Sequence, residues 1–243
     1  MTLLYIVGTG TKHDNVELRW SLRSVAKFAR GVTRIVVAGT PPEWLSDDVE
    51  RFEYRQHLGR TNRNIPDTAL AAIKVLGLTG DVVLAYDDCI LTAETDFGRL
   101  PLLCRGWSLP KETSSDNGYF KALVETRRFL LDHELPCIDF EQHAFKVFSA
   151  DAIMRRFGLV RKSIDESAYG VTADCLFVNL TLAEDPRRQI EFRQDLKLRK
   201  MTEADLSAGW CTSFSDAAFD DPAFVPLMNA HFGQPCRYER SDK

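Results

Sequence analysis

Two adjacent aspartates, Asp87 and Asp88, are the residues of this sequence with the clearest capacity for chemistry. They follow directly on the largely apolar run DVVLAY (81 to 86), which is typical of a buried strand. Ligands of open parallel sheets bind beyond the carboxyl ends of the strands, and paired carboxylates there suit a hard cation such as Mg²⁺ or Mn²⁺. We therefore predict Asp87 and Asp88 as metal ligands, with Asp87 also binding the cofactor and Asp88 also catalytic. The alternative is a polar turn.

A basic stripe runs along the segment from residue 14 to residue 30, beside an apolar face at helical spacing. Guanidinium groups bind phosphates well, so we predict that Arg19 contacts the cofactor and that Arg23 stabilises charge on a leaving group. Lys27 and Arg30 are assigned to a solvated face, which is also the alternative interpretation of the whole stripe.

Two further segments carry candidate functional groups. Gly8, Thr9 and Gly10 follow the first apolar run, and their backbone amides could approach a nucleotide, although the segment matches neither the dinucleotide-binding nor the phosphate-loop pattern. Asp139 and His143 occur four residues apart in IDFEQHAF, which predicts an oriented catalytic base or a pair of metal ligands. A structural histidine is the alternative.

Strands and helices that would position these groups alternate along the chain. Apolar runs predict strands at 3 to 7, 33 to 39 and 81 to 86, with a weaker one near residue 52. Helical periodicity follows Asp14, whose spacing from Glu17 resembles a capping box, and again follows Pro66. Further helices are predicted at about 117 to 134 and 150 to 157. This order predicts an α/β fold with a mostly parallel sheet flanked by helices.

Composition narrows the class of protein. The chain has 243 residues, 44% of them hydrophobic and 27% charged, with no linker-like tract, which predicts one globular domain. A net charge of −4 excludes a global attraction to nucleic acid or to an anionic membrane. The six cysteines form no CxxC pair, and no serine, zinc or thiol hydrolase motif occurs. Apolar runs are too short for a membrane span, so we expect a cytoplasmic protein.

The block NVELRWSLRS, then PPEWL, then the acidic pair Asp87-Asp88, resembles in order and spacing the Stealth-type sugar-phosphate transferases and related phage and bacterial glycosyltransferase-like proteins. The resemblance covers about the first 105 residues well. Asn64 in RTNRNI, the Asp139 and His143 segment, and the ending FGQPCRYE match more loosely. Tyr86 stands where asparagine is usual, and Arg60 where lysine is common.

This resemblance implies a single GT-A-like (Rossmann-like) domain over 1–243, with 1–105 as the nucleotide and metal half and 106–243 as the acceptor side. It implies a metal-dependent transferase that uses a nucleotide-diphosphate sugar, Mn²⁺ or Mg²⁺ at the acidic pair, and Asn64 among the cofactor-binding residues. Transfer of the sugar and transfer of sugar 1-phosphate both remain open.

The resemblance also implies an acceptor hydroxyl on a surface glycan or on a hydroxymethylated base of phage DNA, in the cytoplasm of a bacterium or of a phage-infected host. A basic cluster at 187 to 200 could line a DNA site, although a solvated helical face explains it as well. A catalytically silent nucleotide-binding protein and a DNA-binding module are the other functions that we consider.

Overall fold

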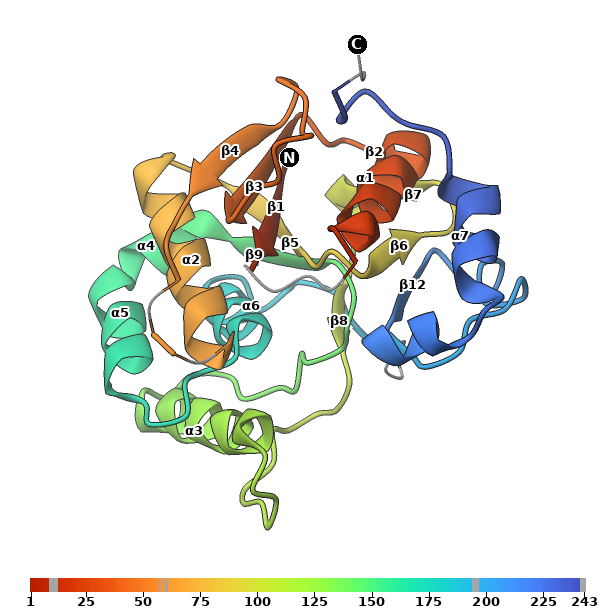
Figure 1. The fold of residues 1–243 in the computed structure, drawn as a ribbon. Helices are drawn as coiled ribbons and strands as arrows, with labels where there is room; N and C mark the ends of the chain where they lie inside the picture. The colour runs from red at the N-terminus through yellow and green to blue at the C-terminus, as the bar shows by residue number, and fades with distance from the viewer. Residues whose placement is uncertain (9–12, 57, 60, 194–196, 241–243) are drawn as a thin grey trace.

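The computed structural model describes residues 1–8, 13–56, 58–59, 61–193 and 197–240 (Figure 1). Its centre is a five-stranded sheet in the order β4-β3-β1-β5-β9, parallel except where β9 runs antiparallel to β5. The strands of this sheet are β1 (Thr2–Val7), β3 (Arg34–Gly39), β4 (Glu50–Glu53), β5 (Asp81–Ala85) and β9 (Lys146–Ser149).

The inner strands are buried on both faces, which explains why the sequence reads there as continuous apolar runs. Parallel neighbours need crossover connections, and two helices supply them. Helix α1 (Val16–Phe28) joins β1 to the strand β3 beside it, and α2 (Thr61–Val75) leads from β4 to β5. The predictions of a mixed α/β fold and a mostly parallel sheet are confirmed.

Strand order reverses at β1, which has β3 on one side and β5 on the other. A reversal of this kind leaves a crevice beyond the carboxyl ends of the two strands. Gly8 follows β1 at this edge, and the turn with Asp87 and Asp88 follows β5. The edge is therefore where the fold favours a ligand.

Five more helices complete the seven α-helices among the described residues, and together with the sheets they form a single compact domain. The predicted helices near 117 to 134 and 150 to 157 are confirmed as α3 and α4. Helix α6 is buried on nearly all sides, so it packs inside the domain. The five are α3 (Gly118–Asp132), α4 (Ala150–Arg155), α5 (Phe157–Glu166), α6 (Ala173–Glu184) and α7 (Phe224–Phe232).

A second apolar core joins α1 to the C-terminal part of the chain, which is blue in Figure 1. The indole of Trp20 is fully buried against Phe214 and Phe224, and its Nε1 donates to Oδ1 of Asn229 at 3.0 Å. A smaller sheet borders this core, with β12 antiparallel to β6 and parallel to β11. Its strands are β6 (Cys89–Leu91), β11 (Lys197–Leu198) and β12 (Cys211–Phe214).

The remaining elements are short. Two further strand pairs and two 3₁₀ helices connect the larger elements. They are β2 (Ala29–Arg30) with β7 (Thr95–Asp96), β8 (Leu102–Cys104) with β10 (Ile190–Phe192), η1 (Phe97–Arg99) and η2 (Asp216–Asp220). Among the described residues, no helix combines the length and the apolar character needed to cross a membrane.

Two predicted helix starts are wrong. Asn15 caps α1 in a left-handed conformation without a side-chain hydrogen bond, and Asp14 has a φ of 54°, so the capping box does not form. Helix α2 begins at Thr61 rather than behind Pro66, which lies inside the helix. Proline there lacks the amide that would bond to the carbonyl of Asn62.

Candidate functional site

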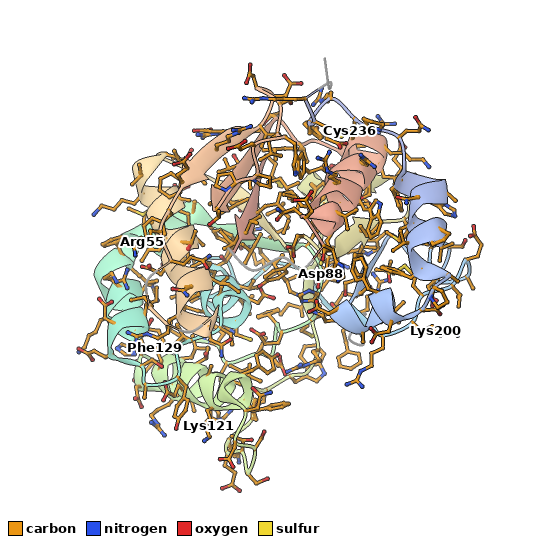
Figure 2. All side chains as sticks on the ribbon, viewed as in Figure 1. Arg55, Asp88, Lys121, Phe129, Lys200 and Cys236 are labelled. Atoms are coloured by element: carbon orange, nitrogen blue, oxygen red, sulfur yellow. The ribbon has the colours of Figure 1, made fainter. Side chains whose placement is uncertain are left out.

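Asp88 lies at the carboxyl edge of the sheet and near the centre of the molecule in Figure 2. Its Oδ1 is 2.5 Å from Nε2 of His143, and its Oδ2 is 3.0 Å from Nζ of Lys197. Burial alone would raise the pKa of Asp88, but His143 and Lys197 outweigh burial and lower the pKa below its ordinary value. Asp88 is therefore an ionised carboxylate held between two nitrogen groups from distant segments.

The neighbouring Asp87 has the opposite electrostatic setting. Burial, and then the charges of Asp88 and Glu17, raise its pKa to about 7. Burial also raises the pKa of Glu17, whose Oε2 is buried without a hydrogen-bond partner. Among the described residues, positive groups thus outweigh burial at Asp88, whereas burial outweighs the effects of His143 on Asp87 and of His13 on Glu17.

Tyr86 connects the acidic pair to the interior. Its ring stacks on the imidazole of His143 with centroids 4.8 Å apart and planes 16° apart. Its hydroxyl donates to Oδ1 of Asp174 at 2.6 Å. Tyrosine at this position therefore orients His143 from one face, while Asp88 orients it through Nε2.

A pocket of about 480 Å³ opens beside these residues. His143, Lys197 and Tyr86, which contact or adjoin the acidic pair, line it, whereas Asp87 and Asp88 do not. Most of the other lining groups are polar or aromatic, which is typical of a ligand site that orients a small molecule. They are Asn62, Ile65, Pro66, Arg105, Tyr119, Phe120, Glu141, Thr172, Ala173 and Asp174.

Two donor sets could hold a cation. The first is Asp88, Cys89 and His143, whose ligand atoms lie within 4.8 Å of one another. It fits Mn²⁺ or Mg²⁺ poorly, because Lys197 already neutralises Asp88 and burial raises the pKa of the Cys89 thiol well above its ordinary value. The other candidates are the carboxylates of Asp87 and Glu17: the charge of Glu17 raises the pKa of Asp87, Oε2 of Glu17 has no hydrogen-bond partner, and both side chains offer the hard oxygen ligands that these ions prefer.

The predicted roles of Arg19 and Arg23 are not what their contacts indicate. Arg23 donates to both carboxylate oxygens of Glu239 at 2.7 Å and to the carbonyls of Phe232 and Gly233. Arg19 donates from Nη1 to the same carboxylate at 2.7 Å, and its guanidinium lies over the ring of Trp44. The donors of Arg23 are used in anchoring the C-terminal segment to α1, so a role at the leaving group is replaced by a structural one.

Asp139 also has a different partner from the one that its spacing indicated. Its Oδ2 accepts from Nε and Nη2 of Arg105 at 3.1 and 3.0 Å, whereas His143 bonds to Asp88. Asp139 therefore positions Arg105 on the pocket wall and does not orient the histidine.

The predicted nucleotide-binding residues Gly8, Thr9, Gly10 and Asn64 lie in two segments. Gly8 lies exposed at the carboxyl end of β1. Thr9 and Gly10 lie outside the described residues. Asn64 accepts from the amide of Leu58 at 3.0 Å, which fixes the segment before α2, while Asn62, Ile65 and Pro66 of the same helix line the pocket.

The basic cluster at 187 to 200 is not a helical face, because its described part forms β10 and β11. Its cations also point to separate partners: Arg188 bonds to Asp81, Lys197 to Asp88 and Lys200 to Asp221. Charges already paired in this way form no continuous rim for DNA.

The sequence interpretation missed Lys197, Glu141 and Asp174. Asp174 carried a signal, since it is an acidic residue within the apolar segment that forms α6. Lys197 carried a weaker one in the alternation DLKLR, which favours a strand over a helix.

No protein-family model matches the chain, and no curated protein matches it either. What can be inferred about function therefore comes from the residues gathered around Asp88 and from the pocket beside them.

Proposed function

We propose that this protein is a transferase that acts on a nucleotide-diphosphate sugar at the carboxyl edge of β1 and β5. The observation that carries the proposal is the convergence of His143 and Lys197 on Asp88 at the strand-order reversal, beside a pocket of about 480 Å³. The mostly parallel α/β sheet and the resemblance to Stealth-type transferases support the same function.

Charge at the site suits a diphosphate. Lys197 contributes a cation that Asp88 holds in place, and although burial alone would lower the pKa of Lys197, Asp88 raises it. Asp87 and Glu17 would hold a divalent cation, which would neutralise the diphosphate when bound. Without that cation the two carboxylates repel a phosphate, so we expect activity to need Mn²⁺ or Mg²⁺.

His143 is the group best placed to take a proton from an acceptor hydroxyl. Asp88 Oδ1 lies 2.5 Å from Nε2, and in the neutral tautomer that donates from Nε2 to Asp88 the lone pair of the imidazole is on Nδ1. As the acceptor oxygen forms its new bond, its proton passes to this nitrogen. The bond to the nucleotide breaks at the same time, and the electron pair leaves with the nucleotide.

Two chemistries give different leaving groups. Attack on the anomeric carbon transfers the sugar and releases a nucleoside diphosphate. Attack on the phosphorus next to the sugar transfers sugar 1-phosphate and releases a nucleoside monophosphate. We propose sugar transfer to a glycan or to a hydroxymethylated DNA base, with sugar 1-phosphate transfer as the second candidate, favoured by the same motif order.

The test is donor consumption followed by phosphorus NMR with UDP-, GDP-, ADP-, CDP- and dTDP-hexoses, each with Mn²⁺, Mg²⁺ or EDTA. Slow hydrolysis of one donor in the presence of metal, reduced about 100-fold or more in Asp87→Ala, would support the proposal, and the nucleotide released would identify the chemistry. Glu50→Gln, at an exposed ion pair on β4, is the control. A folded protein that neither binds nor consumes any donor would overturn it.

A further inference from the structure

Thr172 and Glu141 contribute buried polar atoms to the pocket wall that have no hydrogen-bond partner. Thr172 is 5% exposed, and its Oγ1 makes no hydrogen bond. Oε1 of Glu141 is buried and unpartnered as well, while Oε2 accepts from the hydroxyl of Tyr119 at 3.1 Å. Because buried polar atoms without partners are costly, a ligand that supplies hydrogen bonds would complete this wall.

The wall requires a ligand rich in donors. Asp174 is 4% exposed and, like Glu141, offers a carboxylate to the pocket. Burial and then the charge of Glu141 raise the pKa of Asp174, and the buried Lys146 lowers it. When ionised, these carboxylates only accept hydrogen bonds, and hydroxyl groups are neutral partners that match them; because a hydroxyl group both donates and accepts, it also matches Asp174 in its protonated form.

Apart from Lys197, which the proposed function assigns to the diphosphate, Arg105 is the one guanidinium or ammonium group on the described part of this wall that an anionic ligand group would meet. Arg105 is paired with Asp139 at 3.0 Å, and Lys197 is paired with Asp88 at 3.0 Å. Glu141 and Asp174 would repel a carboxylate or phosphate substituent. The pocket therefore discriminates against charged substituents.

Aromatic rings form the mouth of the pocket. Phe120 is 42% exposed, and its ring meets that of Tyr119 edge to face with centroids 5.4 Å apart. The pocket therefore combines an exposed aromatic ring, which can contact apolar groups of a ligand, with polar groups that can form hydrogen bonds to it. A sugar ring has both a face of C–H groups and a rim of hydroxyls.

We propose that this pocket binds a neutral polyhydroxylated sugar ring, either the hexosyl group of the donor or the terminal sugar of a glycan acceptor. The inference rests on the proposed function for the source of the ring. Its volume of about 480 Å³ lies within the range of small-molecule sites.

The test is calorimetric binding to the intact protein with Thr172→Val and Glu141→Gln. Thr172 precedes α6 without a side-chain cap bond, so valine removes the hydroxyl without removing a cap. Thr68→Val is the matched control, because Thr68 is also buried with an unpartnered hydroxyl but lies outside the pocket.

The donor arm compares each nucleoside diphosphate with its glucose, galactose and glucuronate forms. The acceptor arm titrates methyl glucoside and maltose with the nucleoside diphosphate present. In one of the two arms we expect Thr172→Val and Glu141→Gln each to weaken hexose binding about tenfold, while both variants bind the nucleoside diphosphate as wild type does. The Thr68→Val control should bind the hexose and the nucleoside diphosphate as tightly as wild type. Wild-type protein should bind the glucuronate form about tenfold more weakly than the glucose form.

Failure of this inference is distinct from failure of the proposed function. If donors are consumed but the pocket variants bind every hexose as wild type does, or if glucuronate binds as tightly as glucose, the pocket assignment is overturned and the transferase remains. If no nucleotide binds, methyl glucoside and maltose titrations alone decide: binding weakened by Thr172→Val and Glu141→Gln supports the pocket, and absent or unchanged binding overturns it.

Discussion

Asp88 and His143 lie 55 residues apart in the chain and are joined by a 2.5 Å contact between Oδ1 and Nε2. The other carboxylate oxygen of Asp88 contacts Nζ of Lys197, and the ring of Tyr86 stacks on one face of the histidine ring. A single carboxylate thus fixes a potential base and a potential phosphate-binding cation in one geometry.

If Asp88 and His143 act as a unit, their substitutions will not add. We expect Asp88→Asn and His143→Gln each to lower kcat/KM for donor consumption about 100-fold, because either change removes the oriented base. The double variant should lose little more than either single variant. Steady-state kinetics of the three proteins make the measurement, and losses that multiply would show that the two residues act separately.

Lys197 and Lys200 form a matched pair for testing the role of the β11 cation. Lys197→Met should weaken donor binding about tenfold or more and, by removing a positive neighbour of Asp88, should move the acid limb of the rate profile to higher pH. Lys200 pairs with Asp221 and is 75% exposed, so Lys200→Met should leave both quantities unchanged. Equal effects of the two substitutions would count against the assignment.

Glu239→Gln should destabilise the protein by about 3–5 kcal/mol at pH 7, because it leaves the guanidinium of Arg23 without its buried partner. Arg23 lowers the pKa of Glu239 below its ordinary value, although burial opposes it. The stabilisation is therefore present above that ordinary value and is lost as the pH falls through the lower native pKa. Urea unfolding at pH 7 and at low pH measures this. Glu50→Gln, which breaks the ion pair with Arg34, should lower the free energy of unfolding by less than about 1 kcal/mol. Equal losses for Glu239→Gln and Glu50→Gln would contradict the prediction that the Glu239 pair contributes more.

The raised pKa of Asp174 should make the free energy of unfolding depend on pH with the sign opposite to that expected for Glu239. Burial raises the pKa of Asp174 to about 7, so between its unfolded value and pH 7 the native state binds a proton that the unfolded state releases. Glu141, Lys146, His143 and Tyr86 set this value together with burial. Its contribution to the free energy of unfolding should be greatest in acid and should fall as the pH rises to 7. The free energy of unfolding of wild type should therefore fall relative to that of Asp174→Asn as the pH rises from 5 to about 7, and a difference that does not change with pH would exclude the effect.

Gly170 is required by backbone conformation and by space together. Its φ is +89°, and an added Cβ would lie 2.6 Å from the carbonyl oxygen of Asn62. Gly77 has a φ of +59° and open space around it. We expect Gly77→Ala to cost about 1 kcal/mol and Gly170→Ala at least twice that, by urea unfolding. Equal losses of stability for the two variants would contradict the prediction, because they would show that the backbone around Asn62 can shift to accommodate the added Cβ.

The sheet and the position of the acidic pair were predictable because both depend on local sequence. A strand buried on both faces gives a run such as VVLA, and the residues after it must lie at the sheet edge. The start of α2 was not predictable in this way, because residues 61 to 65 carry little apolar periodicity and the helix is stabilised there by packing. Tertiary contacts decided the outcome.

The partners of the charged residues were beyond the reach of sequence spacing. Asp139 lies near His143 in the chain but bonds to Arg105, and His143 bonds instead to Asp88. Arg19 was expected at a phosphate, whereas its carboxylate partner is 220 residues away. Ion pairs between distant segments leave no periodic signal in one sequence.

The bond between α1 and Glu239 also bears on synthesis. Arg19 and Arg23 emerge early, while Glu239 is translated more than 200 residues later, as its separations of 220 and 216 residues show. Until Glu239 is available, Arg19 and Arg23 on the first helix lack their carboxylate partner. Trp20 on the same helix likewise lacks its contacts with Phe214 and Phe224 until those residues are synthesised. Closure of helix α1 therefore waits until the segment around Glu239 has been synthesised.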